Sequence, residues 1–142
     1  MSKNIKFKIV TLDRVTYEDQ VDQLIVPTES GEITVLPRHA PLVSILKPGE
    51  LRIKKNGHII SLAVSIGFVE IRKNSEVYIL ADSAERAEEI DIEASRAARA
   101  RAEDLLQQKQ NRNDVDFAKL QAIINREVAR LKIAGKYRNL KK

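Results

Sequence analysis

The chain has 142 residues, of which 43% are hydrophobic and 32% charged, and its formal net charge is +5 at pH 7. This length and composition are typical of one soluble globular domain, or of a small domain with an appendage. The chain contains no cysteine, which excludes disulfides and cysteine metal sites and fits a reducing compartment. No apolar run approaches the ~20 residues of a membrane span, and the first residues lack an apolar signal core, so neither a span nor export is expected.

The positive charge is concentrated toward the C-terminus. Residues 1–86 have 12 Lys/Arg and 11 Asp/Glu, a net charge of +1, whereas residues 87–142 have 13 and 9, a net charge of +4. From Arg130 onward there are six basic residues and no acidic residue. A basic C-terminal segment suits binding to an acidic partner, such as nucleic acid, anionic lipid or an acidic protein surface. The simpler interpretation is a solvated tail that keeps the chain soluble.

Up to about residue 81, hydrophobic and polar residues alternate with the two-residue period of strands. Strands are predicted at residues 5–9, 21–26, 33–35, 42–46, 51–53, 59–64, 68–71 and 77–80. Asn56-Gly57 is a strong hairpin signal, and Pro37 and Pro41 bracket a rigid, exposed loop that contains His39. Short strands at this spacing predict an antiparallel β-sandwich or flattened barrel.

The period changes after Ala81. Residues 84–110 contain no glycine or proline and are rich in alanine, which favours a helix. Residues 111–114 form a turn signal, and Asp114 or Asp116 can cap a second helix. An apolar stripe on that helix comprises Phe117, Leu120, Ile124, Val128 and Leu131. Two helices joined by a short loop predict an antiparallel hairpin.

The first helix offers mainly small side chains to its partner: Ala94, Ala97, Ala98 and Ala102, with Leu105 and Leu106 near its end. Alanine buries little area, so the seam between the helices is weak at ~25 cal/mol per Å² of apolar surface. The hairpin is therefore a candidate moving part, with a static appendage as the alternative. The expected class is α+β, with a β-sandwich over residues 1–84 and a helical hairpin with a basic tail over residues 85–142.

The residues that carry catalysis and metal binding are sparse. There are two histidines, His39 and His58, without metal-ligand spacing and without a nucleophile–base–orienter pattern. No nucleophile elbow or glycine-rich phosphate loop occurs. Acids at the start of the first predicted helix are explained by its dipole. We therefore expect no enzyme, no metal site and no required cofactor.

Several segments resemble a known family. The first of them comprises Glu32-Ile33 and Leu36-Pro37-Arg38-His39-Ala40-Pro41-Leu42. The others are Lys47-Pro48-Gly49-Glu50-Leu51-Arg52-Ile53, Gly67-Phe68-Val69-Glu70-Ile71 and Leu80-Ala81-Asp82-Ser83-Ala84-Glu85. In this order, they are similar to motifs of the epsilon subunit of bacterial F-type ATP synthases. Ile66 stands where the family usually has glycine, and Thr34 replaces a common glycine. The likeness extends from end to end of the chain.

The resemblance implies a non-catalytic subunit of the rotating central stalk. The β-sandwich would sit on the gamma subunit and on the polar loops of the c-ring, at the cytoplasmic face of the bacterial membrane, with membrane association only through the complex. The segment toward the c-ring maps onto Glu29, Ser30, Gly31 and Glu32, with the His39 loop nearby. The carboxylate of Glu32 could make a charge-assisted contact with the ring or be a solvated acid at a strand end.

The resemblance also implies a regulatory hairpin, which folds against the sandwich or extends along gamma into the head of alpha and beta subunits and obstructs ATP hydrolysis. The residues expected to contact an acidic segment of beta are Arg126, Arg130, Lys132 and Lys136. Many members also bind ATP on the folded hairpin, and Ile90, Asp91, Arg101, Arg126 and Arg130 match that site. The motif's arginine and alanine are here Ala94 and Ser95, so weak or absent ATP binding is expected.

A second interpretation is a nucleic-acid- or ribosome-associated β-domain with a basic helical arm. It depends on the basic residues from Arg130 onward. Tyr137 is the one aromatic residue in that segment, and base stacking generally needs a larger aromatic surface. We therefore expect no nucleic-acid partner.

Overall fold

The computed structural model describes residues 4–108 and 114–141. It divides into two compact units, residues 1–86 and 87–142. The predicted turn at residues 111–113 and Lys142 lie outside the described residues.

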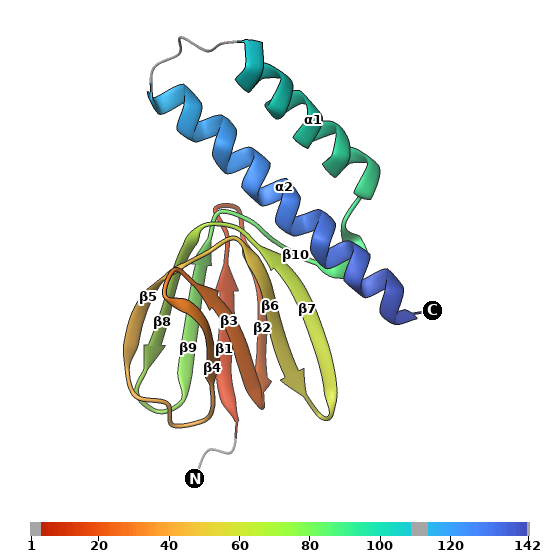
Figure 1. Ribbon diagram of the computed structural model, residues 1–142. Coiled ribbons are helices and arrows are strands. Elements are labelled where there is room, and N and C mark those ends of the chain that lie inside the picture. The colour runs from red at the N-terminus through yellow and green to blue at the C-terminus, as the bar shows by residue number, and fades with distance from the viewer. Residues whose placement is uncertain (1–3, 109–113, 142) are drawn as a thin grey trace. The chain divides into compact units, whose positions relative to one another are not determined.

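The first unit is a single, strongly curved sheet (Figure 1). Its strands are β1 Ile5–Val10, β2 Val15–Val21, β3 Gln23–Thr28, β4 Gly31–Val35, β5 Leu42–Leu46, β6 Gly49–Lys55, β7 His58–Val64, β8 Gly67–Arg72, β9 Glu76–Ala81 and β10 Ala84–Arg86. Their order is β10-β7-β6-β3-β5-β8-β9-β1-β2, with β4 paired to β3. This arrangement confirms the predicted β-sandwich or flattened barrel.

One pairing differs from the antiparallel prediction. The first strand, β1, pairs antiparallel with β2 but parallel with β9, in the register Phe7↔Val77 and Ile9↔Ile79. More than sixty residues separate these partners in the sequence, so no short turn ties their directions, and a parallel pair needs such a long connection.

The two-residue period places one face of each strand in the core. In β1, Ile5 and Ile9 are 0% exposed and Phe7 is 1% exposed, while Lys6 is exposed. The other fully buried side chains of the core include Val21, Leu24, Val26, Val35, Leu46, Leu51, Ile53, Val69 and Ile79. The core therefore draws on strands β1 to β9 and holds them as one unit.

The prediction of one strand at residues 21–26 was wrong. Two strands, β2 and β3, meet at Asp22, whose backbone N–H donates to the carbonyl of Lys54. Strand β2 was missed because it is mostly polar, with Tyr17 and Val21 its only buried residues. The hairpin at Asn56-Gly57 is confirmed, since both residues have positive φ, +50° and +78°, as a tight two-residue turn requires.

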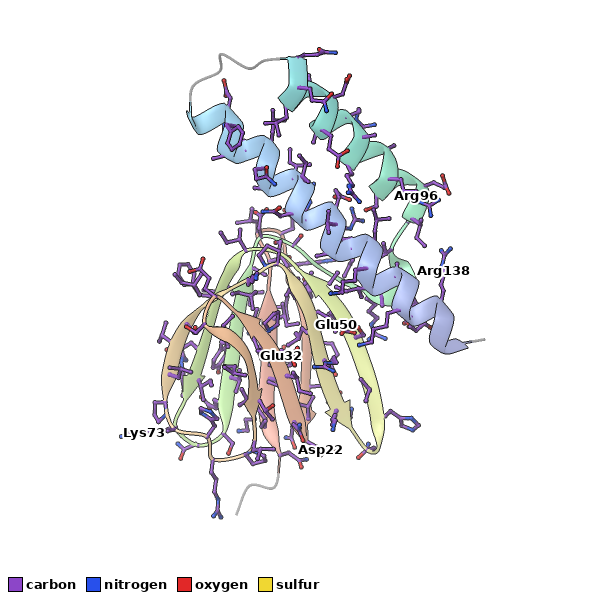
Figure 2. All side chains as sticks on the ribbon, in the orientation of Figure 1. Asp22, Glu32, Glu50, Lys73, Arg96 and Arg138 are labelled. Carbon is purple, nitrogen blue, oxygen red and sulfur yellow. The ribbon has the colours of Figure 1, made fainter. Side chains whose placement is uncertain are left out.

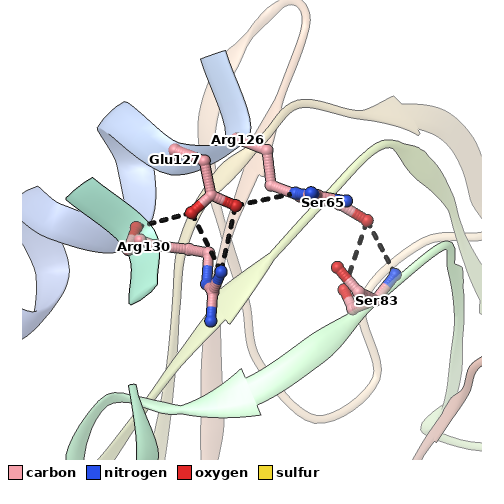
Figure 3. Close-up of polar contacts among 6 residues, drawn as sticks. Ser65, Ser83, Arg126, Glu127 and Arg130 are labelled. Atoms are coloured by element: carbon pink, nitrogen blue, oxygen red, sulfur yellow. Dashed lines mark hydrogen bonds and ion pairs between the residues drawn. The ribbon is translucent and has the colours of Figure 1, made fainter. Parts of the chain in front are cut away.

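The first unit ends with a short strand that is pinned by two serines. The expected boundary after residue 84 falls within β10, whose residues pair with β7. Just before β10, the N–H of Ser83 donates to Oγ of Ser65 at 2.7 Å, and the hydroxyl of Ser65 donates to the carbonyl of Ser83 at 3.3 Å (Figure 3). The backbone N–H of Ser65 also donates to that carbonyl, at 3.0 Å. This exchange sets the point at which the chain leaves the sheet.

The second unit is the predicted helical hairpin. It comprises a short 3₁₀ turn at Ala87–Glu89, α1 at Ile92–Gln108 and α2 at Asp114–Lys141, with the two helices side by side (Figure 1). The side chain of Asp91 caps α1, because its Oδ1 accepts a hydrogen bond from the N–H of Ala94 at 3.0 Å. The 3₁₀ turn also contacts α2.

The predicted seam of the hairpin was partly wrong. Phe117 and Val128 are 53% and 39% exposed, and Ala94 and Ala97 are exposed. The buried residues of α2 are Leu120, Glu127, Ile133 and Ala134, and those of α1 are Ser95 and Ala102. Ser95 and Ala102 are seven residues apart, as are Leu120, Glu127 and Ala134, which is the spacing of residues that face a partner helix.

Gly67 is required by a close approach of β8 and β9. A Cβ at this position would lie 1.9 Å from the carbonyl oxygen of Leu80 and 2.8 Å from Cα of Ala81. We expect Gly67→Ala to lower the free energy of unfolding of the first unit by at least about 3 kcal/mol, because backbone atoms would have to move. Hydrogen exchange of the β8 and β9 amides measures the effect.

Gly135→Ala is the control for this change. A Cβ at residue 135 meets no atom within 4 Å, and alanine favours a helix interior by about 1 kcal/mol over glycine. Unchanged exchange in β8 and β9 of Gly67→Ala would contradict the proposed clash.

Candidate functional site

A row of exposed hydrophobic side chains crosses three strands of the first unit. Ile45 on β5 pairs with Phe68 on β8, and Phe68 pairs with Leu80 on β9. Their exposed fractions are 42%, 55% and 56%. Directly paired residues lie on the same face of a sheet, so these three side chains form one contiguous patch, called here the apolar row.

Two further exposed residues adjoin the apolar row. Val43, two residues before Ile45 on β5, is 68% exposed, and Ile66, just before β8, is 60% exposed. Monomeric soluble proteins rarely expose contiguous apolar surface of this kind, which marks sites of protein association. The apolar row is therefore a candidate docking surface.

The segment Glu29–Glu32 forms the tight turn between β3 and β4. Gly31 adopts φ of +115°, and the hydroxyl of Thr28 donates to the carbonyl of Gly31 at 2.6 Å. Glu29 and Ser30 are exposed. Glu32 accepts a hydrogen bond from Arg52 Nη2 at 2.7 Å, across β3; Glu32 is labelled in Figure 2. The turn therefore presents exposed polar groups, with the charge of Glu32 already paired.

The loop between Pro37 and Pro41 is held by its own hydrogen bonds. His39 donates its backbone N–H to Leu36 O at 3.1 Å, and Arg38, at φ of +67°, donates its N–H to Ser75 Oγ at 2.8 Å. Together with the β8–β9 turn, the loop borders an open hollow of about 500 Å³, lined by Arg38, His39, Ala40, Pro41, Lys73, Asn74 and Ser75.

The Glu29–Glu32 turn and the His39 loop are not neighbours. Strand β4 connects them, with Gly31 at one end and Val35 at the other, so they lie at opposite ends of that strand. The expectation that the His39 loop lies near the turn was therefore wrong. The reason is that β4 is extended over its whole length, about 3.3 Å per residue.

The seam of the hairpin is built around a buried carboxylate. Glu127 on α2 is 0% exposed. Its Oε2 accepts a hydrogen bond from Ser95 Oγ of α1 at 2.5 Å, and both of its oxygens accept from Arg130 Nη1 at 2.9 Å. Oε1 also accepts from Arg126 Nε at 3.1 Å (Figure 3). Glu127 thus joins the two helices through Ser95 and gathers two arginines of its own helix.

These contacts lower the pKa of Glu127. Burial alone would raise the pKa of this carboxyl group, but the hydrogen bonds from Ser95 and Arg130, with the charge of Arg130, outweigh burial, and Arg126 adds to them. The pKa therefore lies below the usual value for glutamate, and Glu127 is ionised at neutral pH. A buried carboxylate is tolerated where it is paired in this way.

The predicted ATP-site residues are only partly brought together. Arg126 and Arg130 converge on Glu127. Asp91 caps α1, Ile90 is 3% exposed, and Arg101 is exposed on α1.

Of the residues expected to contact the catalytic head, Arg126 and Arg130 are held by Glu127 within the hairpin. Lys132 and Lys136 are exposed on α2.

Sequence reasoning missed Glu127, Ser95 and the apolar row. An acidic residue on a helix normally indicates a solvated face. Glu127, however, is seven residues from both Leu120 and Ala134, and this spacing indicates that it belongs to the seam between the helices. The apolar row was missed because exposed and buried strand residues look alike in sequence. Within the described ranges 4–108 and 114–141, no cluster of residues suits a metal ion. No helix in that part of the chain is long and apolar enough to span a membrane.

Comparisons with known proteins agree over almost the whole chain. Residues 4–87 match the β-sandwich domain, and residues 88–135 the long α-helix domain, of the ATP synthase Delta/Epsilon chain family. The chain is 41% identical over 134 residues to the ATP synthase epsilon chain of Desulforamulus reducens, covering 94% of this chain and 99% of that one. It is 46% identical over 130 residues to the epsilon chain of Chloroflexus aggregans, covering 92% and 91%.

A solved structure has a similar fold. A chain in the Euglena gracilis mitochondrial ATP synthase, determined as OSCP, F1 and c-ring, superposes with a TM-score of 0.76 at 22% identity, covering 91% of this chain and 80% of that one. At this identity the likeness concerns the fold alone.

The lowered pKa of Glu127 predicts a pH dependence of the hairpin. A carboxyl group with a lowered pKa in the folded state stabilises that state fully above its ordinary pKa of 4.5 and loses this contribution as the pH falls through the folded pKa. We expect the thermal stability of the helices, followed by far-ultraviolet circular dichroism, to fall as the pH is lowered below about 4.5.

Glu127→Gln should reduce that fall, because glutamine does not titrate. The matched control is Glu103→Gln, which removes a half-exposed ion pair with Arg99 within α1 and should leave the pH profile close to that of the unsubstituted chain. Identical profiles for Glu127→Gln and the unsubstituted chain would contradict the assignment.

Proposed function

Because the chain belongs to the family of ATP synthase Delta/Epsilon chains, with epsilon chains among its relatives, we propose that it couples c-ring rotation to the catalytic head and restrains ATP hydrolysis through its hairpin. As an epsilon chain it is a non-catalytic subunit of an F-type ATP synthase. In the proposed role, the β-sandwich is the fixed attachment to the rotor and the helical hairpin is the moving part.

The observation that carries this proposal is the contrast between the two units. The sandwich has a continuous core of fully buried hydrophobic residues. In α1 the buried residues are only Ser95 and Ala102, which contribute little at ~25 cal/mol per Å². A unit with a large core suits permanent attachment, whereas helices with a small polar seam can separate at modest cost.

The apolar row supports attachment to the gamma subunit. Its three side chains could bury their exposed area against a partner and exclude water at the centre of an interface, where aromatic residues such as Phe68 contribute most. Attachment through apolar surface also withstands changes in ionic strength, since screening acts on charges.

The c-ring contact is proposed at the Glu29–Glu32 turn, which offers exposed polar groups at one end of β4. His39 would act separately, at the other end of that strand. The ion pair between Glu32 and Arg52 keeps the turn's charge partly neutral, so a contact with the ring would share or replace Arg52 as the partner.

The hairpin contacts with the catalytic head are proposed at Arg126, Arg130, Lys132 and Lys136. In the closed hairpin the first two hold Glu127. Separation of α1 would take away the Ser95 hydrogen bond, so that the arginines could turn to an acidic surface of the head. The closed hairpin and the inhibiting hairpin would thus use the same arginines for different anions.

The proposed location is peripheral, on the cytoplasmic face of a bacterial membrane, with attachment through the complex. The basic end of α2 would then face protein carboxylates rather than nucleic acid.

A truncation tests the proposed brake. ATP hydrolysis is measured for an alpha–beta–gamma complex without epsilon, to which either the full chain or residues 1–89 are added. We expect both to bind the complex and the full chain alone to inhibit hydrolysis, because residues 1–89 keep β10 and lack both helices. Binding without inhibition by the full chain would refute the brake, and absence of binding by both would refute the attachment.

A substitution in the apolar row tests the attachment to gamma. We expect Phe68→Ser to weaken binding to the same complex by about thirtyfold, equivalent to about 2 kcal/mol for a central interface residue. The matched control is Ile59→Ser on β7, because Ile59 is similarly exposed at 61% but lies outside the apolar row. Equal affinities of the two variants would remove the apolar row from the interface.

A further inference from the structure

We propose that Glu127 is a built-in counter-anion that makes closure of this hairpin independent of any added anionic ligand, ATP included. The inference deepens the proposed function, since it concerns what controls the moving part, but the contacts that carry it lie entirely within the second unit. Glu127 would thereby determine the ligand specificity of the hairpin: with the carboxylate present, the arginine pair has no need of a phosphate.

The carboxylate of Glu127 is coordinated by side chains of both helices. Its two oxygens accept hydrogen bonds from three side chains, Ser95, Arg126 and Arg130, at distances between 2.5 and 3.1 Å. Arg130 reaches both oxygens through Nη1, and Arg126 reaches Oε1 through Nε. Guanidinium groups are the usual protein partners of carboxylates and of phosphates alike. The same pair of arginines would therefore accept a phosphate if the carboxylate were absent.

Glu127 is more deeply buried than the two arginines that contact it. The side chain of Glu127 is 0% exposed, while those of Arg130 and Arg126 are 22% and 38% exposed. Removal of the carboxylate would leave two neighbouring cations deprived of the acceptor that both contact. Like charges so placed repel each other unless an anion enters, so the substituted hairpin should either open or take up an anion from solution.

A hydrogen bond of Glu127 links the two helices. Both arginines are on the same helix as Glu127, so their ion pairs do not by themselves hold α1. The hydroxyl of Ser95 is what carries the contact across the seam. The carboxylate thus does two things at once: it neutralises the arginines of α2 and accepts a hydrogen bond from α1.

An anion that is part of the chain differs from a free ligand in its effective concentration. A ligand that binds only the closed state favours closure by an amount that grows with its concentration. An anion within the chain is always present at a fixed effective concentration. A hairpin closed by Glu127 would therefore respond to rotor contacts and to its intrinsic stability, and not to the level of nucleotide.

The test uses the full chain. Because the chain has no native cysteine, cysteines at the exposed positions Ala97 on α1 and Ala122 on α2 can be spin-labelled specifically, and their distance distribution reports opening. Each variant is measured alone, with millimolar inorganic phosphate and with millimolar ATP, and binding is measured by calorimetry. The variants are Glu127→Ala, Glu127→Gln, Ser95→Ala and, as a matched control, Glu103→Ala.

For the unsubstituted chain and for Glu103→Ala we expect one short-distance population that neither anion alters, and no saturable heat of binding. For Glu127→Ala we expect the open population to rise about tenfold or more, as loss of a buried charge-assisted contact requires, and phosphate or ATP to restore closure with measurable heat. Glu127→Gln should open the hairpin less, because the amide oxygen still accepts a hydrogen bond, and Ser95→Ala should open it without creating anion binding.

Two results would overturn the proposal: closure or heat of binding in the unsubstituted chain on addition of ATP or phosphate, or a Glu127→Ala hairpin that stays closed without any response to anions. Hydrogen exchange of the sandwich amides shows whether a variant is folded. None of these measurements involves ATP hydrolysis. The proposed role of Glu127 can therefore be refuted while the proposed inhibition of hydrolysis stands, and the inhibition can be refuted while the role of Glu127 stands.

Discussion

The hairpin depends on one constraint: a carboxylate can be buried only where its charge is met. Glu127 satisfies this condition with Ser95 of α1 and with two arginines of its own helix. Breaking such a contact is strongly destabilising, whereas replacing the whole cluster by apolar residues is often neutral or better. The polar seam is therefore explained less by added stability than by its effect on how the two helices align. Only one alignment of α1 along α2 places a hydroxyl opposite Glu127.

The sandwich is held together by different physics. Its core is apolar and lies on one face of every strand from β1 to β9, and at Gly67 the backbones of β8 and β9 approach too closely for any side chain. Such a unit resists gradual deformation, because close-packed interiors lose contacts as soon as they are displaced. The Ser65–Ser83 exchange holds the exit of the chain at the edge of this unit.

Much of the fold could be predicted from sequence because local signals determine it. Alternation identified Ile5, Phe7 and Ile9 as inward-facing, and Asn56-Gly57 fixed a hairpin. The pairing of β1 with β9 could not be predicted, since its partners are distant in sequence and no turn links them. Strand β2 was overlooked because polar residues occupy most of it. The limits therefore arise where tertiary contacts, rather than local period, decide the structure.

The functional residues were harder to predict for the same reason. Arg126 and Arg130 were recognised as a shared helical face, but their counter-ion was not, because an acid between two arginines normally indicates a solvated helix surface. The apolar row was also hard to predict, because Ile45, Phe68 and Leu80 are hydrophobic residues of the kind found in a core but are exposed. In both places the residue type disagrees with its environment, a buried charge in one and exposed hydrophobes in the other. Such disagreements are costly for an isolated domain and are expected where a partner or a second state completes the structure.

The two disagreements also differ in what would resolve them. Exposed hydrophobic side chains are satisfied only by another molecule, so the apolar row makes sense in an assembly and not in the free chain. Glu127 is already satisfied within the hairpin, by hydrogen bonds from Ser95 Oγ, Arg126 Nε and Arg130 Nη1. An acidic partner of those arginines would compete with Glu127 for their positive charge. The apolar row is thus completed by a partner molecule, whereas the carboxylate is completed by the two helices of the hairpin, so the first depends on assembly and the second on the contact between α1 and α2.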